Sequence, residues 1–428
     1  MSENKQVRGQ EKDPDWRKKE ESYREILKKY PDVSPFVITQ IDVQRRGVFY
    51  TDAALARVNP AIHQINKPGF VVTVTGLHED HGIPTSLLLR DGTSIIVSET
   101  SNQTQRDPYT VDVVDGKTVL IDEDDIIEEV EYWEKPQFFD KTTSRGTPMN
   151  QVLGARPQRY SVYMSNYCHF WTTPGHGCKY CGIGTKGAKF KNADGERFHP
   201  QDLRETMREM IREKGRFTGV ILTGGSILSG AEPFDDELEG YITALKIMGE
   251  IFETRRFPSQ VNSTALTRKQ LERLHNETGL SSYTSDLEVF DEEIFKWICP
   301  GKAAHIPYAE YKHRLYDAVE IFGKGQVNTG IVSGVELATP HGHKSEEEAL
   351  RKNFEQAEEL TSHGVGLKHD VWRVVPGSIF FNQATPSLDY YVRLTRGFYQ
   401  IMQKAGIPTY MDSYRKCGMH PNINMDRI

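Results

Sequence analysis

The sequence lacks the features of a membrane-spanning or secreted protein. Across its 428 residues there is no apolar run of about 18 side chains, and the N-terminus has no basic start followed by an apolar stretch and small residues. A spanning helix needs the first feature, and a secretory signal needs the second. The sequence therefore predicts a cytoplasmic protein that does not act at a membrane.

Positive charge is also scarce. Lysine and arginine number 53 against 60 aspartates and glutamates, which gives a net charge of −7, and no long basic block is present. Nucleic-acid binding usually leaves a basic footprint, so a nucleic-acid partner is not expected and a small-molecule substrate is favoured. Hydrophobic residues make up 37% of the chain, which is enough for one large core and a smaller second domain.

Cysteine is too rare for a disulfide framework. The chain has five cysteines, an odd number, and they are Cys168, Cys178, Cys181, Cys299 and Cys417. The first three fall within 14 residues of each other. Such clustering is typical of metal binding in a reducing compartment, whereas we expect the separate Cys299 to pack as a small hydrophobic side chain.

The first third of the chain is polar and then rich in short apolar runs. Residues 1–35 are expected to form a polar helical arm with one helix near Asp15–Tyr30. Residues 36–135 are expected to form a small β-rich domain, and residues 136–158 a linker. The apolar runs of the β-rich domain are Gly69–Thr75, Ser86–Arg90, Ser94–Ser98 and Thr118–Asp122.

Two Asp-Gly pairs and an acidic run mark the β-rich segment further. Asp91-Gly92 and Asp115-Gly116 separate apolar runs, and Asp-Gly is a strong hairpin signal. Asp122–Glu134 is strongly acidic but contains interleaved apolar residues. We interpret it as the solvated face of a strand or helix.

From residue 159 the pattern alternates between strand and helix. The predicted strands are Ser161–Ser165, Gly219–Thr223, Gln260–Thr264, Ser282–Val289, Gln326–Ser333 and Val365–Val375. The predicted helices are Gln201–Lys214, Asp236–Glu253, Arg268–Asn276, Tyr308–Phe322, Glu346–Ser362 and Leu388–Ala405. This alternation predicts parallel βαβ units with right-handed crossovers. The expected fold class is α/β, a partial (βα)6 TIM-like barrel over residues 159–385, with a helix and tail over 386–428 covering it.

The three clustered cysteines have the spacing Cys-x9-Cys-x2-Cys just after the first barrel strand. Three thiolates from one loop suit a 4Fe-4S cluster whose fourth iron stays open to an outside ligand. The alternative is a zinc loop with His169 or His176 as fourth ligand. Zinc loops usually contain a second Cys-x2-Cys pair, which is missing here, so the spacing favours iron and sulfur without excluding zinc.

Residues 159–380 resemble the radical S-adenosylmethionine (radical SAM) superfamily, in particular its biotin synthase and HydE-like branch. Tyr180-Cys181-Gly182 is similar to the aromatic-Cys-Gly end of that family's cluster loop. The family usually has Cys-x3-Cys-x2-Cys, so the spacing here is atypical. The resemblance implies that Cys168, Cys178 and Cys181 hold a 4Fe-4S cluster.

Further motifs resemble the family's SAM-binding residues. Gly224, Gly225 and Ser226 resemble the glycine motif that meets the SAM amino group. Asp286 and Glu288 resemble acids that hold the ribose or the amine. The remaining residues that the resemblance assigns to cofactor binding are Tyr180, Gly182, Arg314, which would pair with the SAM carboxylate, and Val332, which would pass the adenine. Val374–Ser378 resembles the end of the family's sixth strand.

The resemblance implies reductive cleavage of S-adenosylmethionine to a 5′-deoxyadenosyl radical that abstracts hydrogen from a small molecule. Methylation, rearrangement and carbon–carbon bond chemistry all fit, in a transferase, lyase or mutase. An electron donor such as flavodoxin or ferredoxin is implied. Two alternatives stay open, namely modification of a protein or peptide and a non-enzymatic zinc or iron-sulfur scaffold.

The chain's last segment suggests a cover for the barrel. Residues 410–420 are polar and aromatic without helical periodicity, and they include a thiol near a histidine. A radical enzyme must exclude water from its site. We therefore predict that the tail folds back to the barrel mouth and places Cys417 or His420 near the substrate as a catalytic residue. The alternative is a surface tail.

Overall fold

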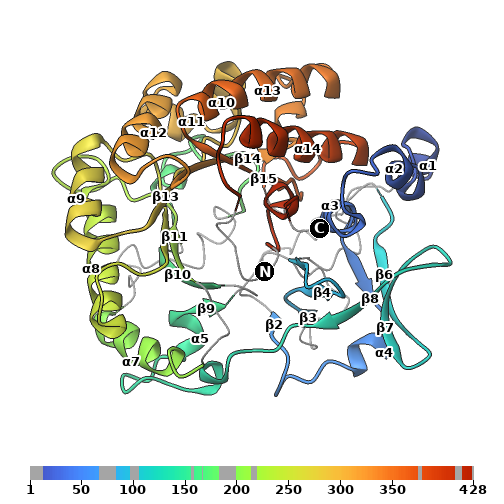
Figure 1. Ribbon diagram of the computed structural model, residues 1–428, viewed down its shortest axis with the longest axis horizontal. Coiled ribbons are helices and arrows are strands. Elements are labelled where there is room, and N and C mark those ends of the chain that lie inside the picture. The colour runs from blue at the N-terminus through green and yellow to red at the C-terminus, as the bar shows by residue number, and fades with distance from the viewer. Residues whose placement is uncertain are drawn as a thin grey trace, which may run out of the picture.

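The computed structural model describes residues 13–66, 83–96, 106–155, 159–165, 167–182, 199–213, 219–374, 378–409 and 417–426. The predicted strand at 69–75, the Pro-Gly pair at 376–377 and the tail residues 410–416 lie outside this set. Two sheets organise the described part of the chain, a seven-stranded sheet and a six-stranded sheet (Figure 1).

The larger sheet contains all six predicted barrel strands. Its order is β15-β14-β13-β12-β11-β10-β9, and every neighbouring pair from β10 to β15 is parallel. Its strands are β9 (Gly154–Ala155), β10 (Arg159–Ser165), β11 (Gly219–Gly224), β12 (Ser259–Asn262), β13 (Ser282–Thr284), β14 (Val327–Ser333) and β15 (Gly366–Val371). The antiparallel β9 closes one edge. A parallel sheet in chain order is the predicted partial barrel, and that fold class is confirmed.

Helices connect these strands and cover the outside of the curved sheet (Figure 1). They are α7 (Pro200–Met210), α8 (Asp235–Phe252), α9 (Arg268–Thr278), α10 (Glu292–Ile298), α11 (Pro300–His305), α12 (Tyr308–Phe322), α13 (Glu346–Ser362) and α14 (Leu388–Lys404). Six of the eight match predicted helices closely. The pair α10 and α11 was not predicted as two helices, because each is too short to show a helical period.

The fourth barrel strand is shorter than predicted. It was expected over Ser282–Val289 but ends at Thr284, and only Glu288 bridges onward to Ile331. Glu288 has a φ of 71°, in the left-handed region that side-chain-bearing residues rarely adopt. The segment still follows β14 because Ser285 and Glu288 donate their N–H groups to carbonyls of that strand's residues. The predicted acids therefore lie in a turn beside β14.

The smaller sheet has the order β1-β6-β7-β8-β4-β5. Its strands are β1 (Val48–Tyr50), β4 (Leu87–Leu89), β5 (Ser94–Ile95), β6 (Tyr109–Val114), β7 (Lys117–Asp122) and β8 (Asp125–Tyr132), and β2 (Ile65–Asn66) pairs separately with β3 (Ile83–Pro84). Both Asp-Gly turns are confirmed. Asp115 and Gly116 have φ values of 50° and 76°, as a two-residue hairpin loop requires. The acidic run forms β8 with its preceding turn, the predicted solvated strand.

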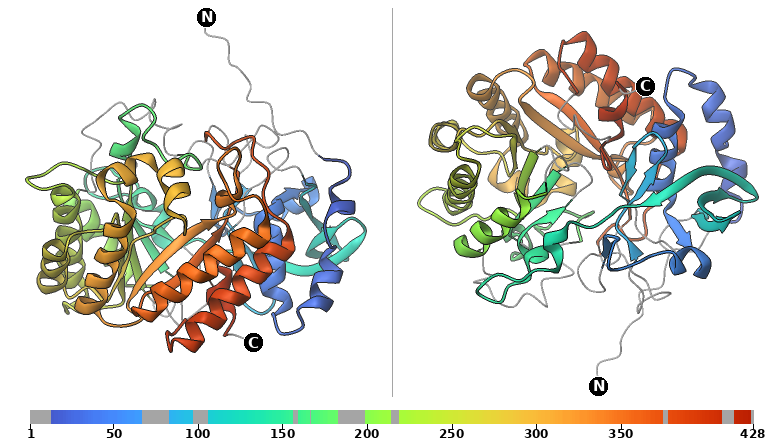
Figure 2. Two further views of the ribbon diagram at one scale, coloured as in Figure 1. Left: turned by 90° about the horizontal axis from the view of Figure 1, so that it is seen from above. Right: turned by 60° about the horizontal axis from the view of Figure 1, so that its bottom comes forward.

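The N-terminal segment differs from the single predicted helix. It forms α1 (Trp16–Lys19) and α2 (Tyr23–Lys29), because Ser22 and Glu25 make a capping box that starts a new helix. A further helix, α3 (Pro35–Arg46), was not predicted. It lies beside α14 and β15 (Figure 2). The domain boundaries stay a prediction.

The described chain also has short elements, which are α4 (Asp52–Ala56), α5 (Met149–Val152), η1 (Gln137–Asp140), η2 (His169–Trp171), η3 (Val335–Leu337) and η5 (Pro421–Asn424). No described helix is long and apolar enough to cross a bilayer.

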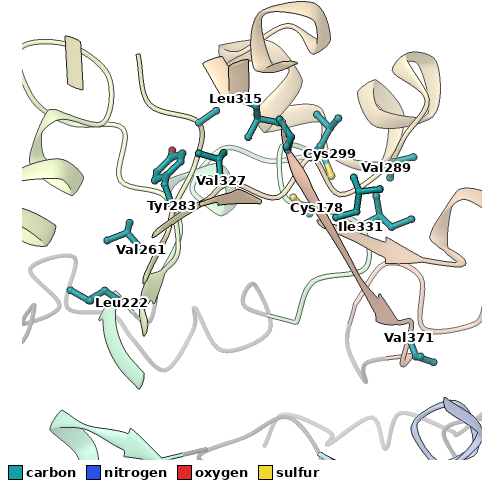
Figure 3. Packing of buried hydrophobic residues seen from close by; sticks show 14 of the residues in the cluster. Cys178, Leu222, Val261, Tyr283, Val289, Cys299, Leu315, Val327, Ile331 and Val371 are labelled. Atoms are coloured by element: carbon teal, nitrogen blue, oxygen red, sulfur yellow. The ribbon is translucent and has the colours of Figure 1, made fainter. Parts of the chain in front are cut away.

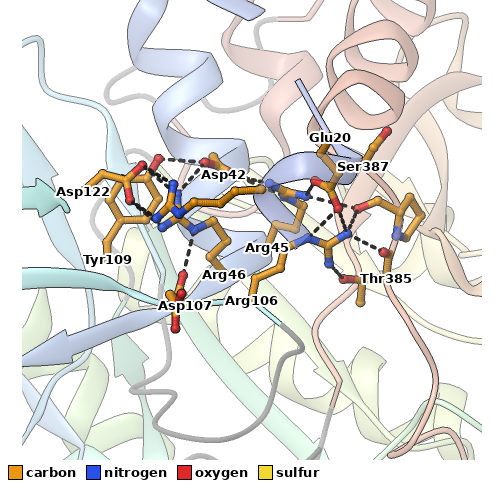
Figure 4. A network of polar contacts seen from close by, with 12 residues as sticks. Glu20, Asp42, Arg45, Arg46, Arg106, Asp107, Tyr109, Asp122, Thr385 and Ser387 are labelled. Carbon is orange, nitrogen blue, oxygen red and sulfur yellow. Dashed lines mark hydrogen bonds and ion pairs between the residues drawn. The ribbon is translucent and has the colours of Figure 1, made fainter. Parts of the chain in front are cut away.

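A buried ionic network fixes α3 (Figure 4). Asp42 lies between Arg45 Nη2 at 2.6 Å and Arg46 Nη1 at 3.3 Å, and it accepts a hydrogen bond from the Tyr109 hydroxyl at 2.7 Å. Burial disfavours the Asp42 carboxylate, but the two arginines outweigh it and lower its pKa to about 2. The network continues through Arg106, which donates to Thr385 and Pro386 before α14. It joins the N-terminal helices to the barrel.

Replacing Asp42 with alanine is expected to destabilise the fold by about 3–5 kcal/mol, because two arginines would stay buried without their partner. Denaturant unfolding measures this. The loss of unfolding free energy in Asp42→Ala should be full above the unfolded-state pKa of Asp42. It should shrink as the pH falls through about 2, the folded-state pKa of that carboxyl. The exposed Asp125, paired with Arg24, is the control, and Asp125→Ala should cost under about 1 kcal/mol. Equal losses in both variants would contradict the network's importance.

Candidate functional site

The three clustered cysteines lie in one loop at the carboxyl end of β10. Cys168 and Cys178 are buried and Cys181 is half-buried. His169 fixes the start of the loop, because its backbone N–H donates to the Ser226 carbonyl at 2.8 Å and its Nδ1 accepts from Leu228 N–H at 3.0 Å. The loop is thereby joined to the segment after β11, at the edge of a barrel that carries chemistry in this architecture.

The second half of the loop is held by the junction of α10 and α11. Lys179 N–H donates to the Ile298 carbonyl at 3.0 Å, and Gly301 N–H donates to the His176 carbonyl at 2.9 Å. Phe380 N–H donates to the Lys179 carbonyl at 3.0 Å. Cys299, in this junction, lies next to Cys178 (Figure 3). Its predicted buried packing is observed, but its neighbour was not foreseen.

The glycine pair after β11 is required by close backbone approach. A Cβ on Gly225 would lie 2.3 Å from the Tyr167 carbonyl oxygen and 2.6 Å from Cys168 Cβ, and one on Gly224 would lie 2.7 Å from Ser165 N. A side chain at Gly225 would push the cysteine loop away, and one at Gly224 would push away the end of β10. Ser226 hydrogen-bonds to Thr264. Close backbone packing therefore explains why both positions are glycine, independently of any role in binding SAM.

Gly225→Ala is expected to displace the cysteine loop and to cost at least about 3 kcal/mol, the upper part of the usual range for overpacking. The iron content after reconstitution and the free energy of unfolding measure the two effects. Gly240, in α8, is the matched control, because a Cβ there meets only the flexible end of Met164 at 3.4 Å. Gly240→Ala should change stability by under about 1 kcal/mol. Normal iron binding by Gly225→Ala would contradict the account.

The donor set of the loop is one that a 4Fe-4S cluster uses, because its three thiols can each bind a different iron of the cluster. Among the described residues, no three histidine, cysteine or acidic side chains converge on a point where one metal ion would sit. The Nδ1 atom of His169, a zinc candidate, already accepts a backbone hydrogen bond. Burial raises the pKa of Cys168, and Cys299 and burial raise that of Cys178.

The predicted acids face this loop from the turn after β13, and both are paired with lysines. Lys302 Nζ donates to Glu288 Oε1 at 2.5 Å, and Lys368 Nζ donates to Asp286 Oδ2 at 3.2 Å. Tyr180 also hydrogen-bonds to Glu288, which brings the cysteine loop to the acids. Burial raises the pKa of Glu288 despite its lysine partner. The structure therefore joins Tyr180, Asp286 and Glu288 in one half-buried polar group.

Val332 borders this group, and Arg314 lies at the carboxyl edge of the sheet. Arg314 lies on α12 and donates to Glu310 at 2.7 Å and to the Ala265 carbonyl at 2.9 Å. Ala265 follows β12, so the guanidinium is at the carboxyl edge of the sheet. Val332 is half-buried in β14, and its N–H donates to the Glu288 carbonyl at 3.1 Å. Gly182 is half-buried at the end of the cysteine loop.

The described tail, residues 417–426, packs against α3 and β15. Asn422 donates to the Leu367 carbonyl at 2.9 Å, and His420 Nδ1 lies 3.0 Å from Asp370 Oδ1. Along β15, Asp370 shares a face with Lys368, which contacts Asp286 from inside the barrel. His369, between them, contacts Thr395 of α14 on the outer face. His420 therefore lies beside the residue of β15 that shares a face with Lys368.

Cys417 is placed differently. It is buried, donates its backbone N–H to Asn424 at 2.7 Å and accepts at its carbonyl from Gln40 of α3 at 2.7 Å. These contacts hold the tail against α3. The sequence also missed two residues of the inner group, Lys302 and Lys368, because a lysine in a strand or helix usually indicates a solvated face.

Comparison with known proteins gives one curated relative. Bacteriochlorophyllide c C-7(1)-hydroxylase of Chlorobaculum limnaeum is 26% identical over an alignment of 267 residues, which covers 58% of this chain and 61% of the relative. The chain therefore spans about three fifths of the length of the relative it matches. No model of a known protein family matches the chain.

Three solved structures are similar at low identity. Methylornithine synthase (PylB) is 15% identical with a TM-score of 0.38, and the match covers 60% of this chain and 72% of that one. A radical SAM methyltransferase from Sphaerobacter thermophilus is 19% identical with a TM-score of 0.39, and the match covers 63% of this chain and 72% of that one. The FeFe-hydrogenase maturase HydG from Carboxydothermus hydrogenoformans is 18% identical with a TM-score of 0.41, and the match covers 63% of this chain and 64% of that one. The barrel assignment rests on the strand order of this chain. One of these structures is a radical SAM methyltransferase, which belongs to the superfamily that the motifs of this chain resemble.

Proposed function

We propose that this chain is a radical SAM enzyme acting on a small molecule. The observation that carries the proposal is the cysteine loop. It leaves β10 at the carboxyl edge of six parallel strands, is tied to the segments after β11 and α10, and reaches the half-buried acids through Tyr180. Carboxyl edges of parallel barrel strands are where such folds carry their chemistry.

Cys168, Cys178 and Cys181 are proposed to hold a 4Fe-4S cluster, and its open iron would bind SAM. When bound together, the cluster and SAM would supply one-electron cleavage of SAM to a 5′-deoxyadenosyl radical. An electron donor such as flavodoxin or ferredoxin would supply the electron. The SAM-binding set is proposed to be Tyr180, Gly182, Gly224, Gly225, Ser226, Asp286, Glu288, Arg314 and Val332.

The chain's own residues would bind and orient the reactants and keep water out. The side chains of the Lys302–Glu288 ion pair are only 11% and 15% exposed, so the protein would hold both charges in place before SAM binds. Arg314 is proposed to give a charge-assisted hydrogen bond to the SAM carboxylate. Doing so would require it to leave or share its bond with Glu310.

The inner wall formed by β15 and the tail is proposed to contact the substrate. His420 is the better supported of the two candidate catalytic residues, because it lies 3.0 Å from Asp370, which shares a face of β15 with Lys368. Burial opposes the charged form of Asp370, but His420 outweighs it and lowers the carboxyl pKa. For Cys417, the buried contacts with α3 favour a role in holding the tail. The five free cysteines support a reducing compartment such as the cytoplasm.

Anaerobic reconstitution with iron and sulfide tests the proposal. We expect about four irons per chain, the broad visible absorption of a 4Fe-4S centre and a spectral change when SAM is added. A colourless protein that binds one zinc ion would contradict the proposal and favour a zinc scaffold.

A further inference from the structure

A fourth cysteine lies against the cysteine loop. The segments 176–179 and 298–301 run side by side, joined by Lys179 N–H to the Ile298 carbonyl at 3.0 Å and Gly301 N–H to the His176 carbonyl at 2.9 Å. Cys178 and Cys299 are enclosed between these two bonds. Their side chains face each other (Figure 3), and the two thiols are hydrogen-bonded.

The position of Cys299 is set by the barrel scaffold and not by the loop. Its N–H donates to the Phe295 carbonyl at 2.8 Å, which ends α10, and its carbonyl accepts from Ala303 N–H at 3.0 Å in α11. Gly301 keeps this junction close to the loop, because a Cβ there would lie 2.5 Å from the His176 carbonyl oxygen. Cys299 itself is fully buried, at 0% exposure. The thiol is therefore presented to Cys178 by rigid helix ends.

We propose that the Cys299 thiol donates a hydrogen bond to the Cys178 thiolate when Cys178 binds iron, and thereby raises the reduction potential of the cluster. This inference rests on the proposed function. A cysteine that ligates iron has lost its proton, so the proton between the two sulfurs must then belong to Cys299. A thiol can donate such a bond, although weakly.

The effect on potential follows from charge. Reduction adds an electron to the cluster and its thiolates, and a donor aimed at a ligand sulfur stabilises the more negative, reduced form. Burial strengthens the bond, because water does not compete for either sulfur. The Lys302 ammonium, three residues after Cys299, is paired with Glu288 at 2.5 Å, and this pairing does not depend on the Cys299 thiol. Cys299 can therefore be varied with that ion pair left in place.

The test compares Cys299→Ala and Cys299→Ser with the unchanged protein after reconstitution. Iron content is measured first, and the midpoint potential is then obtained by a redox titration followed by electron paramagnetic resonance. We expect all three proteins to hold the same iron. Cys299→Ala should have a more negative midpoint potential, and Cys299→Ser, which keeps a donor, should remain close to the unchanged protein. Cys417→Ala, a buried cysteine in the tail, is the control and should leave the potential unchanged.

An unchanged potential in Cys299→Ala with full iron content would overturn the inference. So would loss of iron in both Cys299 variants, because that result would make Cys299 a ligand or a structural residue. Failure of the unchanged protein to assemble a cluster would instead contradict the proposed function itself, and this inference with it.

Discussion

Alanine at Cys168, Cys178 or Cys181 is expected to abolish cluster assembly and SAM cleavage. Each thiolate would bind a separate iron, and the chain offers no other cysteine within the loop to replace a missing one. Iron and sulfide analysis after anaerobic reconstitution measures assembly, and 5′-deoxyadenosine release measures cleavage. The expected loss is complete in each of the three variants.

Cys417→Ala serves as the control, since Cys417 is a buried cysteine outside the loop whose backbone is hydrogen-bonded to Asn424 and Gln40. It should keep the full iron content. Loop variants that retained four irons and cleaved SAM at the normal rate would refute the assignment of the ligands.

Weakened SAM binding is the second large effect, expected in Arg314→Ala and Glu288→Gln. Loss of one charge-assisted hydrogen bond costs about 1.5–3 kcal/mol, which corresponds to roughly 10-fold to 100-fold in affinity. Glutamine is chosen for Glu288 because it keeps a partner for Lys302, which contacts Glu288 at 2.5 Å. Anaerobic equilibrium dialysis of the reconstituted proteins measures the affinity.

Lys312 is the control for Arg314, because it lies on the same helix and pairs with Glu359 at the surface at 2.8 Å. Lys312→Ala should leave the affinity for SAM unchanged. If Arg314→Ala and Glu288→Gln both bound SAM as tightly as this control, the alignment of the two motifs with the SAM site would be wrong.

Local patterns predicted most of the barrel, because its elements are long and periodic. Helices α12 and α13 have the predicted limits, and all six barrel strands are present. Where the prediction failed, a tertiary contact decided the structure. The strand expected to reach Val289 stops at Thr284, since Leu287 N–H bonds to the Thr329 hydroxyl and Glu288 takes a left-handed φ. The hydrophobic periodicity of the sequence does not show where this strand ends.

The sequence predicted several residues of the candidate site, but not which side chains form ion pairs or contacts with one another. Asp286, Glu288 and Tyr180 were identified through family motifs, and the structure brings them together. Lys302 and Lys368 were missed because lysine is seldom buried unless it is paired, and the pairing partners are distant in sequence. Cys299 was assigned to packing for a similar reason. Its neighbour Cys178 is separated from it by more than a hundred positions and meets it only through the junction of α10 and α11.

The central claim is tested most directly by product analysis after reduction. The reconstituted protein is incubated anaerobically with dithionite and SAM, and the nucleoside products are separated. The account predicts 5′-deoxyadenosine and methionine in equal amounts from the unchanged protein, and neither from Cys178→Ala. Absence of 5′-deoxyadenosine from a protein that holds four irons and binds SAM, or methylthioadenosine in its place, would contradict it.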